Sequence, residues 1–267
     1  MSTNILAKIV AQKFVEVAER KKQISIGELE AMPLFAKEGN SLKLNLVDPN
    51  KTGIIAEFKR QSPSKGIINN TALVHDVTKA YSDFGASGIS VLTDTHFFGG
   101  SLDDLEIAVK NTTPVLRKEF IIDEFQIIEA KAYGASVILL IASCLTPAET
   151  KLLAATAKQL GIEVLLEIHD ETEMEHICDE VDFVGVNNRS LKSFEVNIEH
   201  SLQLRSRLPK NKLSIAESGI YDLATFQLLK KEGFDGFLMG EYFMKQADPA
   251  KAFELFASQI KSSGNAI

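Results

Sequence analysis

The stretch from Val137 to Ile168 reads VILLIASCLTPAETKLLAATAKQLGIEVLLEI, and its pattern decides the fold. Two short apolar runs, Val137 to Ala142 and Val164 to Ile168, flank a segment of helical composition. Thr146-Pro147-Ala148-Glu149 supplies an N-cap, a proline at the first helical position and a capping-box glutamate, and Gly161 follows the end. Because a helix between two strands requires a parallel crossover, the stretch predicts a strand, a helix and a parallel strand.

The same unit repeats along the chain from Gly53 onward. Eight strands, each followed by a helix, fit the size of a (β/α)8 TIM barrel, an α/β fold. An open doubly wound sheet is the alternative, but the turn at residues 60–66 has no Gly-x-Gly-x-x-Gly fingerprint. The apolar runs predicted to form strands are Ile54 to Phe58, Ile89 to Leu92, Val115 to Phe120, Val137 to Ala142, Val164 to Ile168, Phe183 to Val186, Leu213 to Ala216 and Gly236 to Met239.

Residues 1–50 differ from the repeated units. Apolar side chains recur there at helical spacing with charged residues between them, which predicts one amphipathic helix. A second short helix is expected from Gly27 to Phe35. We therefore expect an N-terminal helical cap over residues 1–50, a barrel over residues 53–260, and a single domain over residues 1–267, because no Pro/Gly/Ser-rich linker interrupts the chain. The apolar positions of the first helix are Ile5, Ile9, Val10, Phe14 and Val17.

The composition is that of a globular, acidic protein. Among 267 residues, 29 Lys+Arg stand against 36 Asp+Glu, which gives a net charge of −7 and argues against nonspecific nucleic-acid binding. The longest strongly apolar run, Val137 to Ala142, is far shorter than the ~20 residues of a membrane helix, so no membrane association is expected. The N-terminal pattern lacks the features of a secretory signal, so we expect a cytoplasmic protein. Cys144 and Cys178 have neither disulfide-framework nor zinc-ligand spacing.

Charged and polar side chains stand at the carboxyl ends of several predicted strands, where a barrel places its active site. Any one of them alone could form a salt bridge at the rim. Several converging on one face are harder to explain structurally, because buried charges need mutual pairing and seldom add stability over apolar packing. The residues are Glu57, Lys59, Lys118, Glu167, Asn187, Arg189 and Glu217.

A second set of residues is suited to binding phosphate. Ser62 follows the first predicted strand, Ser218 and Gly219 the seventh, and Gly240 the eighth. The loops after strands seven and eight form the usual phosphate site of this fold, although each glycine taken alone could simply turn the chain. The five histidines have no metal-ligand spacing, so no metal site is expected.

Six motifs together closely resemble the family of indole-3-glycerol phosphate synthase, the barrel enzyme of tryptophan biosynthesis. The resemblance spans nearly the whole chain, and small departures occur at Glu119, where aspartate is commoner, and at His169, where asparagine is frequent. The motifs are Ile54-Ile55-Ala56-Glu57-Phe58-Lys59-Arg60-Gln61-Ser62-Pro63-Ser64, Leu116-Arg117-Lys118-Glu119-Phe120, Leu165-Leu166-Glu167-Ile168-His169, Gly185-Val186-Asn187-Asn188-Arg189-Ser190-Leu191, Ala216-Glu217-Ser218-Gly219-Ile220 and Gly236-Phe237-Leu238-Met239-Gly240.

The resemblance implies a lyase that closes the indole ring of 1-(2-carboxyphenylamino)-1-deoxy-D-ribulose 5-phosphate with loss of CO2 and water, without metal or organic cofactor. Lys118 is then expected to be the acid at the ribulose carbonyl, with Glu57, Lys59 and Glu167 sharing the later proton transfers. Whether Lys59 or Glu167 protonates the leaving hydroxyl stays open. A noncovalent complex with other tryptophan-pathway enzymes is also compatible with the resemblance.

The other site residues are expected to bind the substrate. Arg189 and Lys59 suit its carboxylate, and Asn187, Glu217 and Ser218 its sugar hydroxyls. An apolar wall for the anthranilate ring is expected from Phe98, Phe120 and Phe194, together with the face of the N-terminal helix, while Leu139 is better explained by core packing. The phosphate group is assigned to Ser62, Ser218, Gly219, Gly240 and the backbone N–H of Glu241.

Two other functions remain open at this point. Lys118 at the end of a barrel strand could be the nucleophile of a Schiff-base aldolase, or the barrel could house another phosphosugar enzyme such as an isomerase. The other function is that of a barrel that binds a sugar phosphate for a regulatory or assembly role, but a binder has no need for both Lys118 and Glu167.

Overall fold

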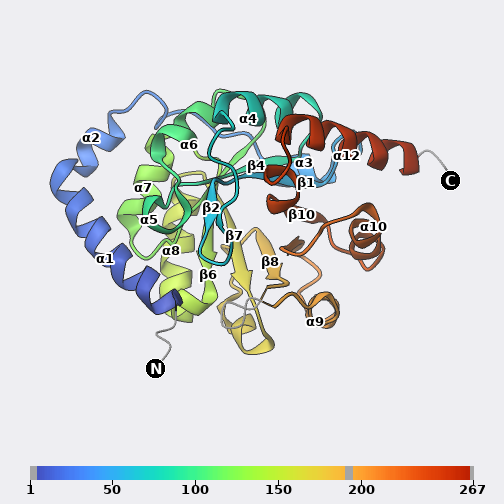
Figure 1. Cartoon of the computed structure of the whole chain (residues 1–267). Helices are drawn as coiled ribbons and strands as arrows, with labels where there is room; N and C mark the ends of the chain where they lie inside the picture. The colour runs from blue at the N-terminus through green and yellow to red at the C-terminus, as the bar shows by residue number, and fades with distance from the viewer. Residues whose placement is uncertain (1–4, 190–194, 265–267) are drawn as a thin grey trace.

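The computed structural model describes residues 5–189 and 195–264. Within these residues eight parallel strands close a barrel in the order β1-β10-β9-β8-β7-β6-β5-β4 (Figure 1). The TIM-barrel prediction is therefore confirmed, and the open-sheet alternative is wrong. The strands are β1 Ile54–Phe58, β4 Gly88–Leu92, β5 Val115–Lys118, β6 Val137–Ile141, β7 Glu163–Ile168, β8 Phe183–Asn187, β9 Leu213–Glu217 and β10 Gly236–Met239.

Helices follow the strands and surround the barrel, as the repeated unit predicts. Short 3-10 segments occur as η1 Ala142–Cys144 and η2 Glu171–His176, and a two-stranded hairpin of β2 Gln61–Ser62 and β3 Gly66–Ile67 lies in the loop after β1. The helices of the barrel are α4 Val74–Asp83, α5 Thr95–Phe98, α6 Leu102–Ala108, α7 Glu124–Ala132, α8 Pro147–Gln159, α9 Ile198–Arg205, α10 Leu223–Lys231, α11 Glu241–Met244 and α12 Pro249–Gly264.

The connection between β7 and β8 differs from the prediction, because η2 replaces the expected α-helix. In the N-terminal region, the first helix forms as expected, as α1 Ile5–Gln23. The second, α2 Ile26–Glu30, ends earlier than predicted, since Pro33 disfavours helical backbone at the residue before it. A third helix, α3 Leu42–Val47, is present that the sequence pattern did not indicate.

The capping signals of α8 form as the sequence predicts. The Thr146 hydroxyl accepts a hydrogen bond from the Glu149 backbone N–H at 3.3 Å, and the Glu149 carboxylate accepts one from the Thr146 N–H at 2.7 Å. Pro147 is the first helical residue, and Gly161 has a φ of +69° just beyond the helix. These local bonds fix where the helix begins and ends between β6 and β7.

Two of the N-terminal helices pack on the barrel, α3 at its amino end and α1 along its outside. α3 lies at the amino ends of β4 and β10, where a Cβ on Gly88 would come within 2.8 Å of Leu42 and one on Gly236 within 2.9 Å of Leu46. α1 runs along the outside next to α7, with Ile9 buried in the cluster that fills the barrel (Figure 1). None of the helices in the described part of the chain combines the length and apolarity needed to cross a membrane.

The contribution of the N-cap of α8 to stability can be tested by mutation. Thr146→Ala removes the side-chain acceptor at the helix start and is expected to lower the free energy of unfolding by about 1 kcal/mol. Chemical denaturation measures this change. Gln159→Ala, at an exposed position of the same helix, is the control and should stay within about 0.5 kcal/mol; equal effects from both would contradict the capping role.

Candidate active site

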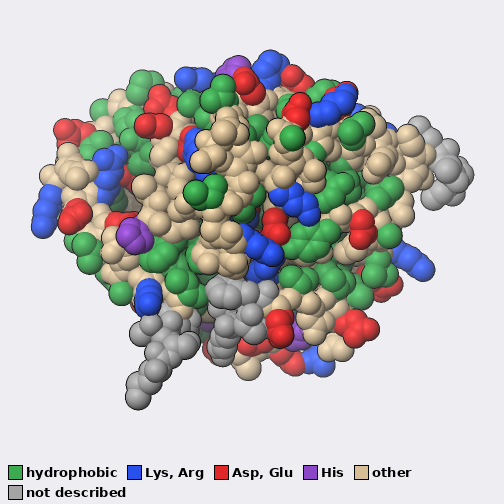
Figure 2. All heavy atoms as spheres, in the orientation of Figure 1, with side chains coloured by type: hydrophobic (Ala, Val, Ile, Leu, Met, Phe, Trp, Pro, Cys, Tyr) green, Lys and Arg blue, Asp and Glu red, His purple; other side chains and the backbone are tan. Residues whose placement is uncertain are grey.

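The charged residues singled out at the strand ends line the same cavity at the carboxyl end of the barrel. Glu217 and Asn187 are the last residues of β9 and β8, and Lys118 ends β5. Figure 2 shows basic and acidic side chains side by side near the middle of this face. Parallel strands carry their ends to one rim, so residues 160 positions apart in the chain meet there. Glu57, Lys59, Glu167 and Arg189 complete the set.

Lys118 is the centre of the charge cluster. Its Nζ lies 2.7 Å from Glu217 Oε2 and 3.2 Å from Glu167 Oε2. The Asn187 amide donates a hydrogen bond to the other oxygen of Glu167 at 3.0 Å, which fixes the orientation of that carboxylate. A single ammonium on β5 therefore bridges two buried carboxylates, one from β7, two strands away, and one from β9, across the barrel.

A second ion pair lies at the end of β1. The Lys59 Nζ is 2.6 Å from Glu57 Oε1, and the Glu57 side chain is almost fully buried. Glycines on neighbouring strands make room for these carboxylates: a Cβ on Gly240 would lie 2.7 Å from Glu57 Oε1, and one on Gly185 would lie 2.1 Å from Glu217 Oε1. Any other residue at Gly185 would displace the Glu217 carboxylate.

The two central carboxylates of the cluster, Glu217 and Glu167, have pKa values shifted in opposite directions. Burial raises the pKa of Glu217 to about 7; the charge of Lys118 opposes this rise and that of Glu167 adds to it. Burial also acts to raise the pKa of Glu167, but Lys118, His169 and Asn187 outweigh it and lower the pKa to about 2. For Lys118, burial disfavours the charge, yet the surrounding carboxylates raise its pKa. Near neutral pH the cavity thus holds an ammonium, a carboxylate and a titrating acid.

An apolar wall stands beside the charged cluster. The rings of Phe98 and Phe120 have centroids 6.0 Å apart, and both side chains line the cavity. Ile5, Leu6 and Ile9 of α1 line the same wall, as the sequence analysis expects for the N-terminal helix. Leu139, which the sequence analysis assigned to core packing, also lines the cavity. Phe194, the remaining predicted aromatic, lies outside the described residues.

The residues predicted to bind phosphate also line the cavity, after the ends of β1, β9 and β10. Ser62, Gly219, Gly240 and Glu241 all line it. Ser218 has a φ of +67°, the only positive value found for a non-glycine residue in the described ranges, and Gly219 follows with +73°. Strained backbone of this kind persists where the surroundings demand it, often at functional sites.

Two other neighbours of the site, Tyr221 and His169, were not predicted to belong to it. Arg189 Nη2 is bonded to the Tyr221 hydroxyl at 3.0 Å and to Glu241 Oε2 at 3.1 Å, and nothing in the sequence pointed to Tyr221. His169 Nε2 lies 3.4 Å from Glu167 Oε1. Its spacing of two from Glu167 along a strand could have indicated this contact. In the described part of the chain, no group of three or more His, Cys, Asp or Glu side chains is arranged to hold a metal ion.

Comparison with known proteins gives two kinds of match. A family model described as indole-3-glycerol phosphate synthase matches residues 6–256. An indole-3-glycerol phosphate synthase of Bacteroides thetaiotaomicron is 42% identical, covering 97% of this chain and 99% of its own, and one of Polynucleobacter asymbioticus is 40% identical, covering 96% and 100%.

Among solved structures, the similarity is one of fold alone. The tryptophan synthase alpha subunit of Legionella pneumophila has a TM-score of 0.62 at 13% identity, over 85% of this chain and 98% of its own. The 3-hexulose-6-phosphate synthase of Salmonella typhimurium has a TM-score of 0.61 at 14% identity, over 78% and 98%. Both matches agree with the barrel described above.

The raised pKa of Glu217 has a consequence for stability. A carboxyl that titrates near 4.3 when unfolded and near 7 when folded stabilises the protein while protonated, and this contribution disappears as pH rises between those values. Glu217→Gln cannot lose a proton. Relative to wild type, its free energy of unfolding should therefore rise by about 1 to 3 kcal/mol between pH 4.5 and 7 and then stay level.

Denaturant unfolding across this pH range measures the difference. Glu30→Gln, at an exposed position of α2, is the matched control and should run parallel to wild type. A Glu217→Gln curve that also runs parallel would show that Glu217 is already ionised at low pH.

Proposed function

Since the chain belongs to the indole-3-glycerol phosphate synthase family, we propose that Lys118 is the acid that starts its ring closure, and that Lys59 and Glu167 divide the later proton transfers. The enzyme is a decarboxylating lyase of tryptophan biosynthesis that acts on a phosphorylated small molecule. The observation that carries the assignment of roles is the position of the Lys118 ammonium, bridging Glu167 and Glu217 at the cavity.

In the first step, the anthranilate ring carbon that bears the carboxylate attacks the ribulose carbonyl. The attack places negative charge on the carbonyl oxygen, which a positioned acid or cation stabilises. Lys118 suits this role because its carboxylate neighbours raise its pKa and keep it charged until the oxygen requires the proton. Loss of CO2 then restores the aromatic ring.

In the last step, the hydroxyl made from that carbonyl leaves as water, and a carbon-bound proton of the new ring is removed. One acid and one base are needed. Glu167, whose pKa is lowered to about 2, is ionised at neutral pH and suits the base. Lys59, held by Glu57 at 2.6 Å, suits the acid, and we therefore assign protonation of the leaving hydroxyl to Lys59 rather than to Glu167.

The remaining residues are proposed to hold the substrate across the cavity. Phe98 and Phe120 would flank the anthranilate ring, and Arg189 and Lys59 would hold its carboxylate before CO2 is lost. Asn187, Glu217 and Ser218 would contact the sugar hydroxyls. The phosphate would lie against Ser62, Ser218, Gly219 and Gly240 and the backbone N–H of Glu241.

The aldolase alternative is disfavoured by the same geometry. A Schiff-base lysine must be neutral to attack a carbonyl, whereas two carboxylates within 3.2 Å keep Lys118 protonated. Treatment with borohydride in the presence of a sugar phosphate distinguishes the two chemistries. Covalent attachment at Lys118 would contradict the acid role.

The broader properties are proposals of the same kind. The net charge of −7 supports a protein without nucleic-acid partners. A cytoplasmic location is proposed because the family is one of biosynthetic enzymes. The proton transfers above require neither metal nor organic cofactor, and the chain is proposed to act as a single domain. Noncovalent association with other tryptophan-pathway enzymes is a further proposal, which co-purification from cells would test.

Lys118→Ala tests the acid role. We expect kcat to fall by about 10²-fold or more, because the developing charge on the carbonyl oxygen loses its proton donor. Indole fluorescence during incubation with the carboxyphenylamino substrate measures turnover. Lys158→Ala removes an exposed lysine of α8 that pairs with Asp182 at 2.8 Å, and this control should keep normal activity; near-normal turnover of Lys118→Ala would refute the assignment.

Ser218→Ala tests the binding role of the hydroxyl. It should raise KM about fivefold, the loss of one hydrogen bond of about 1 kcal/mol, with a smaller change in kcat. Ser218→Gly removes the same hydroxyl but accommodates the positive φ, and should raise KM equally. If only the alanine variant is affected, backbone strain rather than hydroxyl contact is the cause.

A further inference from the structure

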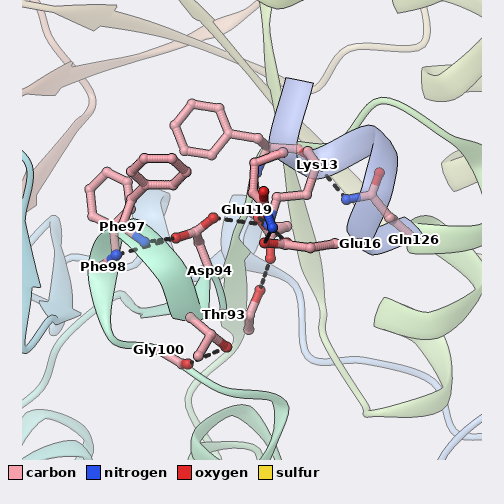
Figure 3. A network of polar contacts seen from close by, with 12 residues as sticks. Lys13, Glu16, Thr93, Asp94, Phe97, Phe98, Gly100, Glu119 and Gln126 are labelled. Atoms are coloured by element: carbon pink, nitrogen blue, oxygen red, sulfur yellow. Dashed lines mark hydrogen bonds and ion pairs between the residues drawn. The ribbon is translucent and has the colours of Figure 1, made fainter. Parts of the chain in front are cut away.

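A buried lysine on α1 reaches toward the cavity without lining it. Lys13 has 4% of its side chain exposed, and its Nζ lies 2.9 Å from both Asp94 Oδ2 and Glu119 Oε1 (Figure 3). Glu16, on the same helix, is 2.6 Å away and partly exposed. Asp94 and Glu119 follow β4 and β5, so this contact joins α1 to the rim where Lys118 stands.

Asp94 holds the segment that carries Phe98. It is the N-cap of α5, and its Oδ1 accepts hydrogen bonds from the backbone N–H groups of Phe97 at 2.7 Å and Phe98 at 3.2 Å. The other oxygen of Asp94 faces Lys13. The position of the Phe98 backbone therefore depends on a carboxylate whose second oxygen is fixed by α1.

Glu119 does the same for Phe120. Its Oε1, which faces Lys13, also accepts the backbone N–H of Phe120 at 2.9 Å, and its Oε2 accepts the Thr93 hydroxyl at 2.7 Å. Gln126 adds a bond to the Phe120 carbonyl at 2.9 Å. Glu119 also follows Lys118 directly, so the same carboxylate borders the charge cluster on the chain.

The contact of Lys13 with the two carboxylates also holds α1 in place beside the cavity. Ile9 lies one helical turn before Lys13 and, with Ile5 and Leu6, faces the apolar side of the cavity. One ammonium thus ties together the three segments that build the aromatic wall: α1, α5 and the residues after β5. Because Asp94 and Glu119 are both almost fully buried, no solvent cation can replace it without entering the protein.

The charge of this contact is stable at working pH. Burial opposes the charge of Lys13, but Glu119 and Asp94 outweigh it and raise its pKa. An apolar contact could have docked α1 more simply, since buried ion pairs seldom add stability over apolar packing. The ion pairs of Lys13 with Asp94 and Glu119 are directional, so they fix the position of each loop in a way that apolar packing does not.

We propose that Lys13 is a positioning residue for substrate binding, which acts through Asp94 and Glu119 to hold Phe98 and Phe120 at the spacing that receives the anthranilate ring. The proposal rests on the proposed function of the cavity. It goes beyond it in assigning selectivity for the aryl end of the substrate to a side chain that touches no substrate. The proposed phosphate residues Ser218, Gly219 and Gly240, after β9 and β10, do not belong to the segments that Lys13 joins.

Lys13→Met keeps the length of the side chain and removes its charge. We expect KM for the carboxyphenylamino substrate to rise about tenfold, the equivalent of losing an aromatic contact, while kcat changes less than about threefold. The dissociation constant of inorganic phosphate, measured by calorimetry, should be unchanged. Arg20→Met is the matched control, because Arg20 also ties α1 to the barrel but pairs with Glu129 at 2.7 Å rather than with Asp94 or Glu119.

A second variant separates positioning from stability. Lys13→Met leaves Asp94 and Glu119 buried without a cation, which should lower the melting temperature. Lys13→Met/Glu119→Gln removes one of these two negative charges and should recover part of the lost melting temperature. The proposal predicts that KM stays high in the double variant. It is overturned if KM returns with the melting temperature, or if Arg20→Met raises KM as much as Lys13→Met.

Different results would overturn the proposed function and the positioning role of Lys13. Absence of turnover by the wild-type protein overturns the proposed function, whatever Lys13 does. Wild-type turnover with an unchanged KM in a folded Lys13→Met protein overturns only the positioning role. If Lys13→Met does not fold, the double variant gives the same two answers.

Discussion

The site depends on one electrostatic arrangement, the Lys118 ammonium shared by Glu167 and Glu217. The three side chains come from strands β5, β7 and β9, whose carboxyl ends meet at one rim because the strands of the barrel are parallel. Each carboxylate is buried and would be costly without the lysine, and burial would disfavour the charge of the lysine without them. Burial of the two carboxylates and the charge of Lys118 therefore depend on each other, and their balance separates the pKa values of Glu167 and Glu217.

The surroundings of the cluster are shaped to permit that arrangement. Gly185 leaves the volume that Glu217 Oε1 occupies, and Gly240 does so for Glu57, so absent side chains are as necessary as the charged ones. The N-terminal region contributes at both ends, with α3 filling the base of the barrel and α1 forming part of the apolar wall. The buried Lys13 network extends the same principle, with pairing of charges used to fix loop positions.

Much of this could be predicted from the sequence, because short-range patterns determine the elements. Each of the strands of the barrel falls within two residues of an apolar run, and the Thr146 to Glu149 signal gives the start of α8. Residues that carry their signal in tertiary contacts could not be found. Lys13 reads as one more charged residue on an amphipathic helix, and its burial exists only once Asp94 and Glu119 approach it. No sequence pattern indicates Tyr221 either. The chemical roles of the site residues remain predictions.

The most direct test is a crystal structure of the protein bound to a reduced substrate analogue, with a hydroxyl at the carbon that carries the ribulose carbonyl. The account predicts that Lys118 Nζ lies about 3 Å from that oxygen, with the aryl ring beside Phe98 and Phe120 and the phosphate against Gly219 and Gly240. An analogue oxygen that contacts other side chains while Lys118 keeps only its two glutamate partners would contradict the central claim.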